Sequence, residues 1–129
     1  MRSLFAMLGI KPRKIDYEDF EKFAKTASEK DLDRYCKAIT EGAEIDFTNS
    51  GWGHAFNYIR TYGKLVQFGT GHYGSMWGSK PLTEGSVLLL KTSSGKIGRY
   101  LVLSCRFERD PRDMYWAYIV CIGYKENLN

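Results

Sequence analysis

The run MYWAYIVCIGY at residues 114–124 constrains the fold most, because it is apolar at both alternating sets of positions. Successive side chains of a strand point to opposite faces, so a strand with one face in water alternates apolar and polar residues. A strand that is apolar on both faces needs cover on both. We therefore predict a central strand, a strand covered by helices, or a strand within an oligomer interface. One set of positions contains Met114, Trp116, Tyr118, Val120 and Ile122, and the other contains Tyr115, Ala117, Ile119 and Cys121.

Two further strands are predicted directly before this run, at residues 86–91 and 97–107. The sequence TSSGK between them is typical of a hairpin turn that contains glycine. Asp110-Pro111 marks the turn into residues 114–124. Within the second strand we expect one face to carry Leu101, Leu103, Cys105 and Phe107.

Helical periodicity is confined to the first third of the chain. Apolar residues at helical spacing predict one helix over 16–27, capped by Asp16, and a second over 29–41. Ser28 and Asp31 form a capping-box pattern at the start of the second helix, and Gly42 is a natural stop. Beyond it, alternation over residues 43–47 predicts a short strand.

These elements predict an α+β fold in a single domain over residues 1–129, with a helical part at 1–42 and a β-rich part at 43–129. Two short N-terminal helices precede a strongly bent antiparallel sheet or a small barrel. Residues 52–62 fit either a helix or a hairpin that turns near Tyr62-Gly63. We favour the hairpin because Gly51 and Gly53 would weaken the start of a helix.

The glycines of LTEGSVLLLK and GKIGRYLVLSCRF carry a resemblance to a known family. Gly85 precedes one predicted strand, and Gly95, Lys96 and Gly98 begin the next. This arrangement resembles the SH3-like small β-barrels, including their KOW-type members, and implies a small SH3-like barrel. RDPRDMYWAYIVCIGY also looks like the ends of small uncharacterised phage proteins. Together the resemblances span residues 82–124. The second implies a viral protein that acts in the cytoplasm of a bacterial host, and neither implies an activity.

The residues that enzymes and metal sites need are sparse. Cys36, Cys105 and Cys121 lack metal-site spacing and predict buried thiols in a reducing, cytoplasmic compartment. His54 and His72 do not fit a two-histidine phosphoesterase pattern, and no GxSxG, Walker or HExxH motif occurs. We therefore predict no catalytic residue, no metal and no cofactor, and favour a non-enzymatic protein. No apolar run reaches the roughly 20 residues of a membrane span, so no membrane partner is predicted.

Charge is distributed unevenly along the chain. Residues 1–50 contain nine Lys or Arg against ten Asp or Glu, whereas residues 51–129 contain ten against five. Attraction for phosphate is therefore expected in the second part. The excess is mild for a nucleic-acid-binding domain, so we rank RNA or DNA below a small anionic ligand.

The stretch FGTGHYGSMWGS at residues 68–79 is the main candidate for a binding site. Nine rings between residues 52 and 77 are interleaved with glycines. Rings stack on bases, and glycines let backbone N–H groups approach a phosphate. Arginines could add bidentate phosphate contacts. In the alternative interpretation, the rings fill the core and the glycines make bends. The candidate ligand-binding residues are Trp52, His54, Arg60, Gly69, Gly71, His72, Tyr73, Trp77, Arg99 and Arg109.

These observations predict a non-enzymatic protein that binds an anionic, base-containing ligand of nucleotide type. Combined with the phage resemblance, the concrete version is a viral protein that sequesters a nucleotide-type immune signal of its host. The alternatives are a protein–protein inhibitor or oligomeric assembly part, with a host protein or a second copy as partner, and an RNA- or DNA-binding small barrel. The first alternative would use strand 114–124 as its edge or interface.

Overall fold

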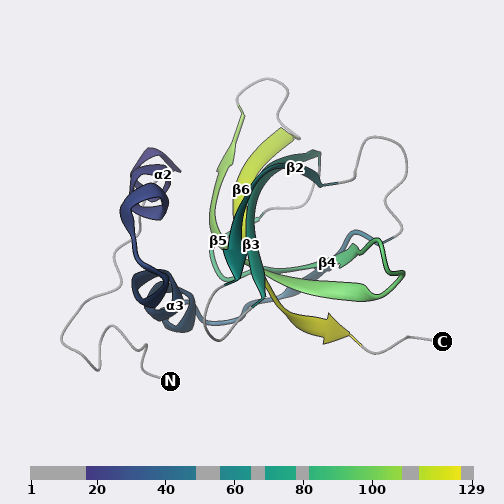
Figure 1. Ribbon diagram of the computed structural model, residues 1–129. Helices are drawn as coiled ribbons and strands as arrows, with labels where there is room; N and C mark the ends of the chain where they lie inside the picture. The colour runs from purple at the N-terminus through teal and green to yellow at the C-terminus, as the bar shows by residue number, and fades with distance from the viewer. Residues whose placement is uncertain (1–16, 49–55, 65–68, 78–81, 109–113, 126–129) are drawn as a thin grey trace.

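The computed structural model describes residues 17–48, 56–64, 69–77, 82–108 and 114–125. Two helices are followed by six strands, which confirms the predicted α+β order. The helices are α2 (Tyr17–Thr26) and α3 (Glu29–Ala38). The strands are β1 (Glu44–Asp46), β2 (Asn57–Lys64), β3 (Thr70–Trp77), β4 (Val87–Lys91), β5 (Ile97–Phe107) and β6 (Met114–Lys125). In Figure 1 both helices lie together beside the sheet, and β4 runs at an angle to the upper parts of β5 and β6.

The two helices begin and end for identifiable reasons. The Ser28 hydroxyl accepts a hydrogen bond from the Asp31 N–H, and the Asp31 carboxylate accepts from the Ser28 N–H, so the predicted capping box is present. Reciprocal bonds of this kind satisfy N–H groups that have no partner within the helix. The second helix stops at Ala38, earlier than predicted. Gly42 is not its stop, because the Gly42 N–H instead donates to the Gly85 carbonyl.

The six strands form one sheet in the order β1-β4-β5-β6-β3-β2. All pairs are antiparallel except β1 with β4, so the predicted antiparallel sheet carries one parallel edge strand. One apolar cluster includes Ile45 of β1 together with Met76 of β3 and Phe56 beside β2. Opposite ends of the strand order therefore meet across one face, which we call the concave face. The sheet is strongly bent, as predicted, and does not close into a barrel.

Strand β6 is central, with β5 on one side and β3 on the other. Its even-numbered residues Tyr118 and Val120 lie in a cluster with the helices, which defines the helix face of the sheet. Its odd-numbered residues Tyr115 and Ile119 lie in the concave cluster. The prediction of a central strand covered on both faces is confirmed. Because both of its edges are paired, β6 cannot serve as the edge strand of an interface.

Tyr118 joins the helices to the sheet. Its ring centroid lies 4.2 Å from that of Phe20 in α2 and 4.5 Å from that of Tyr73 in β3. The Tyr35 hydroxyl of α3 lies 3.1 Å from both the Glu84 carboxylate and the Leu103 carbonyl oxygen. The helical layer is therefore fixed to the sheet by aromatic packing and by buried polar contacts.

Two local predictions are wrong. Tyr62-Gly63 is not a turn, because both residues lie within β2, which continues to Lys64 and pairs with β3. The expected alternation along β5 is also interrupted. Leu101 and Leu103 lie in the helix-face cluster, whereas Cys105 packs against the concave cluster. A register shift between Val102 and Ser104 accounts for the change, since an extra residue moves the following side chains to the other face.

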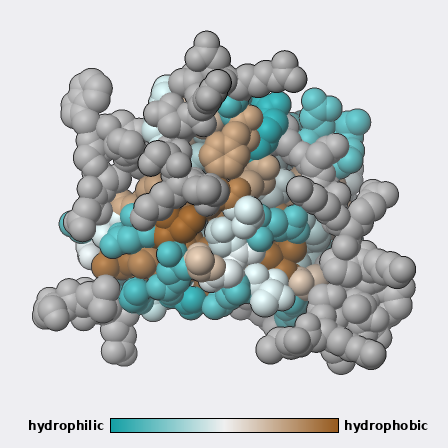
Figure 2. Space-filling view, turned by 180° about the vertical axis from the view of Figure 1, so that it is seen from behind, coloured by the Kyte–Doolittle hydropathy of each residue, from teal (hydrophilic) through white to brown (hydrophobic). Residues whose placement is uncertain are grey.

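Seen from behind, apolar side chains reach the surface in several separate areas among hydrophilic ones (Figure 2). The exposed large apolar residues come from three parts of the sheet: Tyr58 and Ile59 in β2, Trp77 and Phe107 where β3 and β5 end, and Tyr124 near the end of β6. Scattered exposed apolar residues are normal on protein surfaces. Exposure alone therefore does not mark any of these residues as part of a binding site.

Candidate functional site

The centre of the glycine-rich stretch is strand β3, which has a paired strand on each side. The Gly69 N–H, directly before the strand, donates to the Cys121 carbonyl at 2.6 Å. A Cβ on Gly74 would lie 2.6 Å from the ring of Phe56. These glycines allow close strand packing, and their N–H groups are directed toward neighbouring strands. Phosphate contacts at this strand must therefore come from side chains.

The alternation of β3 places the predicted site residues on opposite faces. Tyr73 lies in the helix-face cluster, and Gly71 and Trp77 share its parity. His72 is paired with Ile119, which belongs to the concave cluster. Neighbours in the stretch therefore cannot contact one ligand together.

Three of the predicted residues, Arg60, Tyr73 and Trp77, share the helix face. Arg60 lies opposite Tyr73 in the β2–β3 ladder, and directly paired residues point to the same face. Two residues that were not among the predicted site residues join them. Trp116 lies opposite Ser75, and Arg106 lies opposite Trp116. We call this set of five, Arg60, Tyr73, Trp77, Arg106 and Trp116, the ring–arginine face.

The rings of this face are held in defined positions. Tyr73 and Trp116 are stacked, with ring centroids 5.8 Å apart and an interplanar angle of 18°. The Trp116 indole N–H donates to the Glu108 carboxylate at 2.6 Å. Tyr73 is buried and Trp116 half-buried, whereas Trp77 retains 38% of its surface. The result is an aromatic platform in which Tyr73 and Trp116 are held in place and Trp77 is accessible to solvent.

The two arginines lie on opposite sides of these rings. The Arg60 guanidinium carbon lies 4.8 Å from the centroid of the Tyr62 ring, and Arg60 is exposed. Arg106 is also exposed and forms an ion pair with Glu108 at 3.4 Å. A pair this accessible contributes little to stability, so exchanging Glu108 for a phosphate costs little.

His72 belongs to a different cluster, on the concave face. Its ring centroid lies 4.7 Å from that of Tyr58 and 6.2 Å from that of Tyr100. The His72 Nδ1 and the Thr61 hydroxyl share a hydrogen bond of 3.1 Å. Burial lowers the pKa of His72, so the ring is neutral at neutral pH. It can hydrogen-bond or stack, but it does not supply a positive charge to an anion.

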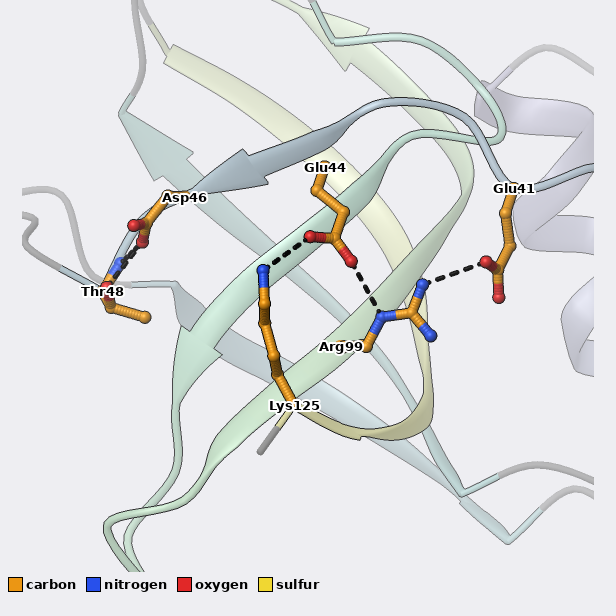
Figure 3. Close-up of polar contacts among 6 residues, drawn as sticks. All are labelled: Glu41, Glu44, Asp46, Thr48, Arg99 and Lys125. Atoms are coloured by element: carbon orange, nitrogen blue, oxygen red, sulfur yellow. Dashed lines mark hydrogen bonds and ion pairs between the residues drawn. The ribbon is translucent and has the colours of Figure 1, made fainter. Parts of the chain in front are cut away.

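Arg99 is separated from the ring–arginine face and lies in an ion-pair network (Figure 3). Its guanidinium donates to Glu44 at 3.1 Å and to Glu41 at 3.0 Å. Lys125 donates to the other oxygen of Glu44 at 2.9 Å. The predicted phosphate contact at Arg99 would have to displace two carboxylates, whereas Arg60 and Arg106 are more accessible.

This network predicts a pH dependence. The hydrogen bond from Lys125, followed by that from Arg99, holds the pKa of Glu44 below its ordinary value. Its contribution to stability is therefore full above that ordinary value, about 4.3, and is lost as pH falls through the lower folded value. We expect Glu44→Gln to lower the melting temperature slightly at neutral pH, where the contribution is full, and to leave it unchanged in strong acid, so that its fall across the acidic range is flatter. Identical acid profiles for Glu44→Gln and wild type would contradict the role of Glu44.

Three predicted site residues, Trp52, His54 and Arg109, lie outside the described residues. Trp116 was assigned only to the apolar pattern of its strand, because nothing in the sequence gives its position relative to Arg106. Among the described residues, no group of three His, Cys, Asp or Glu side chains could hold a metal ion. Neither described helix is long and apolar enough to cross a membrane. No protein-family model, curated protein or solved structure matches the chain.

Proposed function

We propose that this chain is a non-enzymatic protein that binds an anionic, base-containing ligand of nucleotide type on the ring–arginine face. The observation that carries the proposal is the presence of stacked rings and two exposed arginines on one face of the sheet. A base would stack on Trp77 beside the Tyr73–Trp116 pair. Base–aromatic stacking typically contributes about 1–3 kcal/mol per base.

Arginine is suited to the anionic part of such a ligand. Its planar fork can bind two phosphate oxygens at once, and Arg60 and Arg106 are each exposed on a strand of the sheet. Strand β3, at the centre of the glycine-rich stretch, therefore contributes the rings of Tyr73 and Trp77. Strands β2 and β5 contribute the positive charges of Arg60 and Arg106. The narrower version, a viral protein that sequesters a host immune signal, rests on the phage resemblance rather than on this face.

Binding can be tested by tryptophan fluorescence and melting temperature with a panel of nucleotides. Tripolyphosphate serves as an anion without a base. We expect nucleotides to bind better than tripolyphosphate, and Trp77→Ala and Arg60→Ala each to weaken binding about tenfold, equivalent to about 1.4 kcal/mol. Tyr124→Ala, an exposed ring elsewhere, and Lys30→Ala, an exposed charge on α3, are the matched controls.

The outcome that would overturn the proposal is equally specific. If no nucleotide at millimolar concentration changes the fluorescence or the melting temperature, the ring–arginine face is not a nucleotide site. If the control variants weaken binding as much as Trp77→Ala, the ligand binds elsewhere.

A protein partner is a second candidate, and strand β2 favours it. This strand stands at the end of the strand order, and its Tyr58 and Ile59 are 46% and 53% exposed. Edge strands with exposed apolar residues can pair with a strand of another chain. Retention of a cellular protein by the wild type but not by Ile59→Lys would support this alternative, and retention by both variants would remove β2 from it.

A further inference from the structure

We infer that the ligand of the ring–arginine face is a short single-stranded oligonucleotide that crosses the strands, with phosphates on both sides of the stacked bases. This inference rests on the proposed function and names its ligand class. It follows from where the two arginines stand relative to the rings.

The strand order separates the two arginines by two whole strands. Arg106 belongs to β5 and Arg60 to β2, and the rings between them belong to β6 and β3. Neighbouring strands lie about 4.8 Å apart, so the backbones of the two arginines are separated by about 14 Å across the sheet. The two pairings are offset along the strands: Arg106 lies opposite Trp116, which faces Ser75, whereas Arg60 faces Tyr73, two residues from Ser75. The path from Arg106 over Trp116 to Arg60 therefore runs diagonally across the sheet.

A mononucleotide does not match this path. Its phosphates form one chain on one side of its sugar, so a base stacked over the rings leaves one of the arginines unused. A linear oligonucleotide has a phosphate before and after each internal nucleotide. It can therefore place a base over Trp116 while its phosphates reach Arg106 at one end and Arg60 at the other.

The rings also select single strands over duplexes. Trp77 and the Tyr73–Trp116 pair belong to a regular sheet, whose surface cannot enter a duplex to reach stacked bases. Stacking on such a platform requires bases that are already unpaired, as in the single-stranded ligands of other aromatic sheet surfaces.

Glu108 reduces the positive charge that Arg106 presents on the ring–arginine face. Its carboxylate accepts from Trp116 and pairs with Arg106, so it competes with a phosphate for the guanidinium. Glutamine at this position retains an oxygen that can accept from Trp116 and removes the negative charge. Glu108→Gln therefore separates ring positioning from charge competition.

The test compares 5′-phosphorylated hexathymidylate with thymidine monophosphate and with an annealed, blunt-ended duplex of mixed sequence that is long enough to stay paired at the assay temperature, using tryptophan quenching and full-length protein. We expect the single-stranded hexamer to bind at least tenfold more tightly than either probe. Arg60→Ala and Arg106→Ala should each weaken the hexamer about five- to tenfold, with multiplicative effects in the double variant because the sites are far apart. Glu108→Gln should strengthen hexamer binding, and Lys30→Ala should leave it unchanged.

Three outcomes would overturn this inference in distinguishable ways. If monophosphate and hexamer bind equally, with Arg106→Ala silent, the proposed function survives and the oligonucleotide does not. If the annealed duplex binds as tightly as the single strand, stacking on unpaired bases is wrong. If none of the probes binds and the nucleotide panel also fails, both proposals fail together.

Discussion

Replacing Gly74 by alanine is expected to destabilise the protein by about 1–3 kcal/mol, the range found when atoms are forced into a well-packed region. The new Cβ would lie 2.6 Å from the Phe56 ring and 2.9 Å from the carbonyl carbon of Asn57. Backbone at Asn57 cannot yield without moving the start of β2 away from β3. Urea unfolding followed by circular dichroism measures the loss.

Gly71 in the same strand is the matched control. Around it, an added Cβ meets only ordinary contacts, at 3.7 Å or more, from Tyr62 and Ile119. Gly71→Ala should leave stability within about 0.5 kcal/mol or raise it slightly, because alanine restricts the unfolded chain more than glycine does. Equal losses for Gly71→Ala and Gly74→Ala would show that general strand propensity, rather than the contact with β2, determines the effect.

Replacing Tyr118 by alanine is expected to cost about 3–5 kcal/mol, as for other large buried aromatic residues. Tyr118 is 2% exposed and contacts Phe20 of α2, so its loss leaves a cavity where the helices meet the sheet. Chemical denaturation gives the magnitude. Hydrogen exchange should show the largest loss of protection within α2.

Tyr124 provides the control in the same strand, because it is 58% exposed. Tyr124→Ala should change the free energy of unfolding by no more than about 0.5 kcal/mol. A loss below 1 kcal/mol for Tyr118→Ala, or equal losses for the two tyrosines, would mean that the helices are held to the sheet by other contacts.

The fold was largely predictable because its signals are periodic. The two apolar sets of residues 114–124 predict a strand that needs cover on both faces, as β6 has in the middle of the sheet, and Ser28 with Asp31 marks the start of α3. The shift between Val102 and Ser104 carries no such signal. It depends on how β5 pairs with β6, and pairing is a property of two strands rather than of one.

The candidate site was less predictable for the same reason. Alternation alone indicates that His72 and Tyr73 face opposite ways. However, only the ladder register brings Arg60 opposite Tyr73 and Arg106 opposite Trp116. Arg99 pairs with carboxylates 55 and 58 residues away in the sequence, Glu44 and Glu41. Its pairing with two carboxylates could not be inferred from the local sequence, which contains no acidic residue.

The position of β6 between two apolar clusters also determines how the protein can come apart. Each cluster uses one face of this strand as its boundary, through Tyr118 and Val120 on one side and Tyr115 and Ile119 on the other. Opening either side would expose the back of the layer that supports the other. The helices and the concave half of the sheet are thereby linked in one cooperative unit, and neither is an independently stable piece.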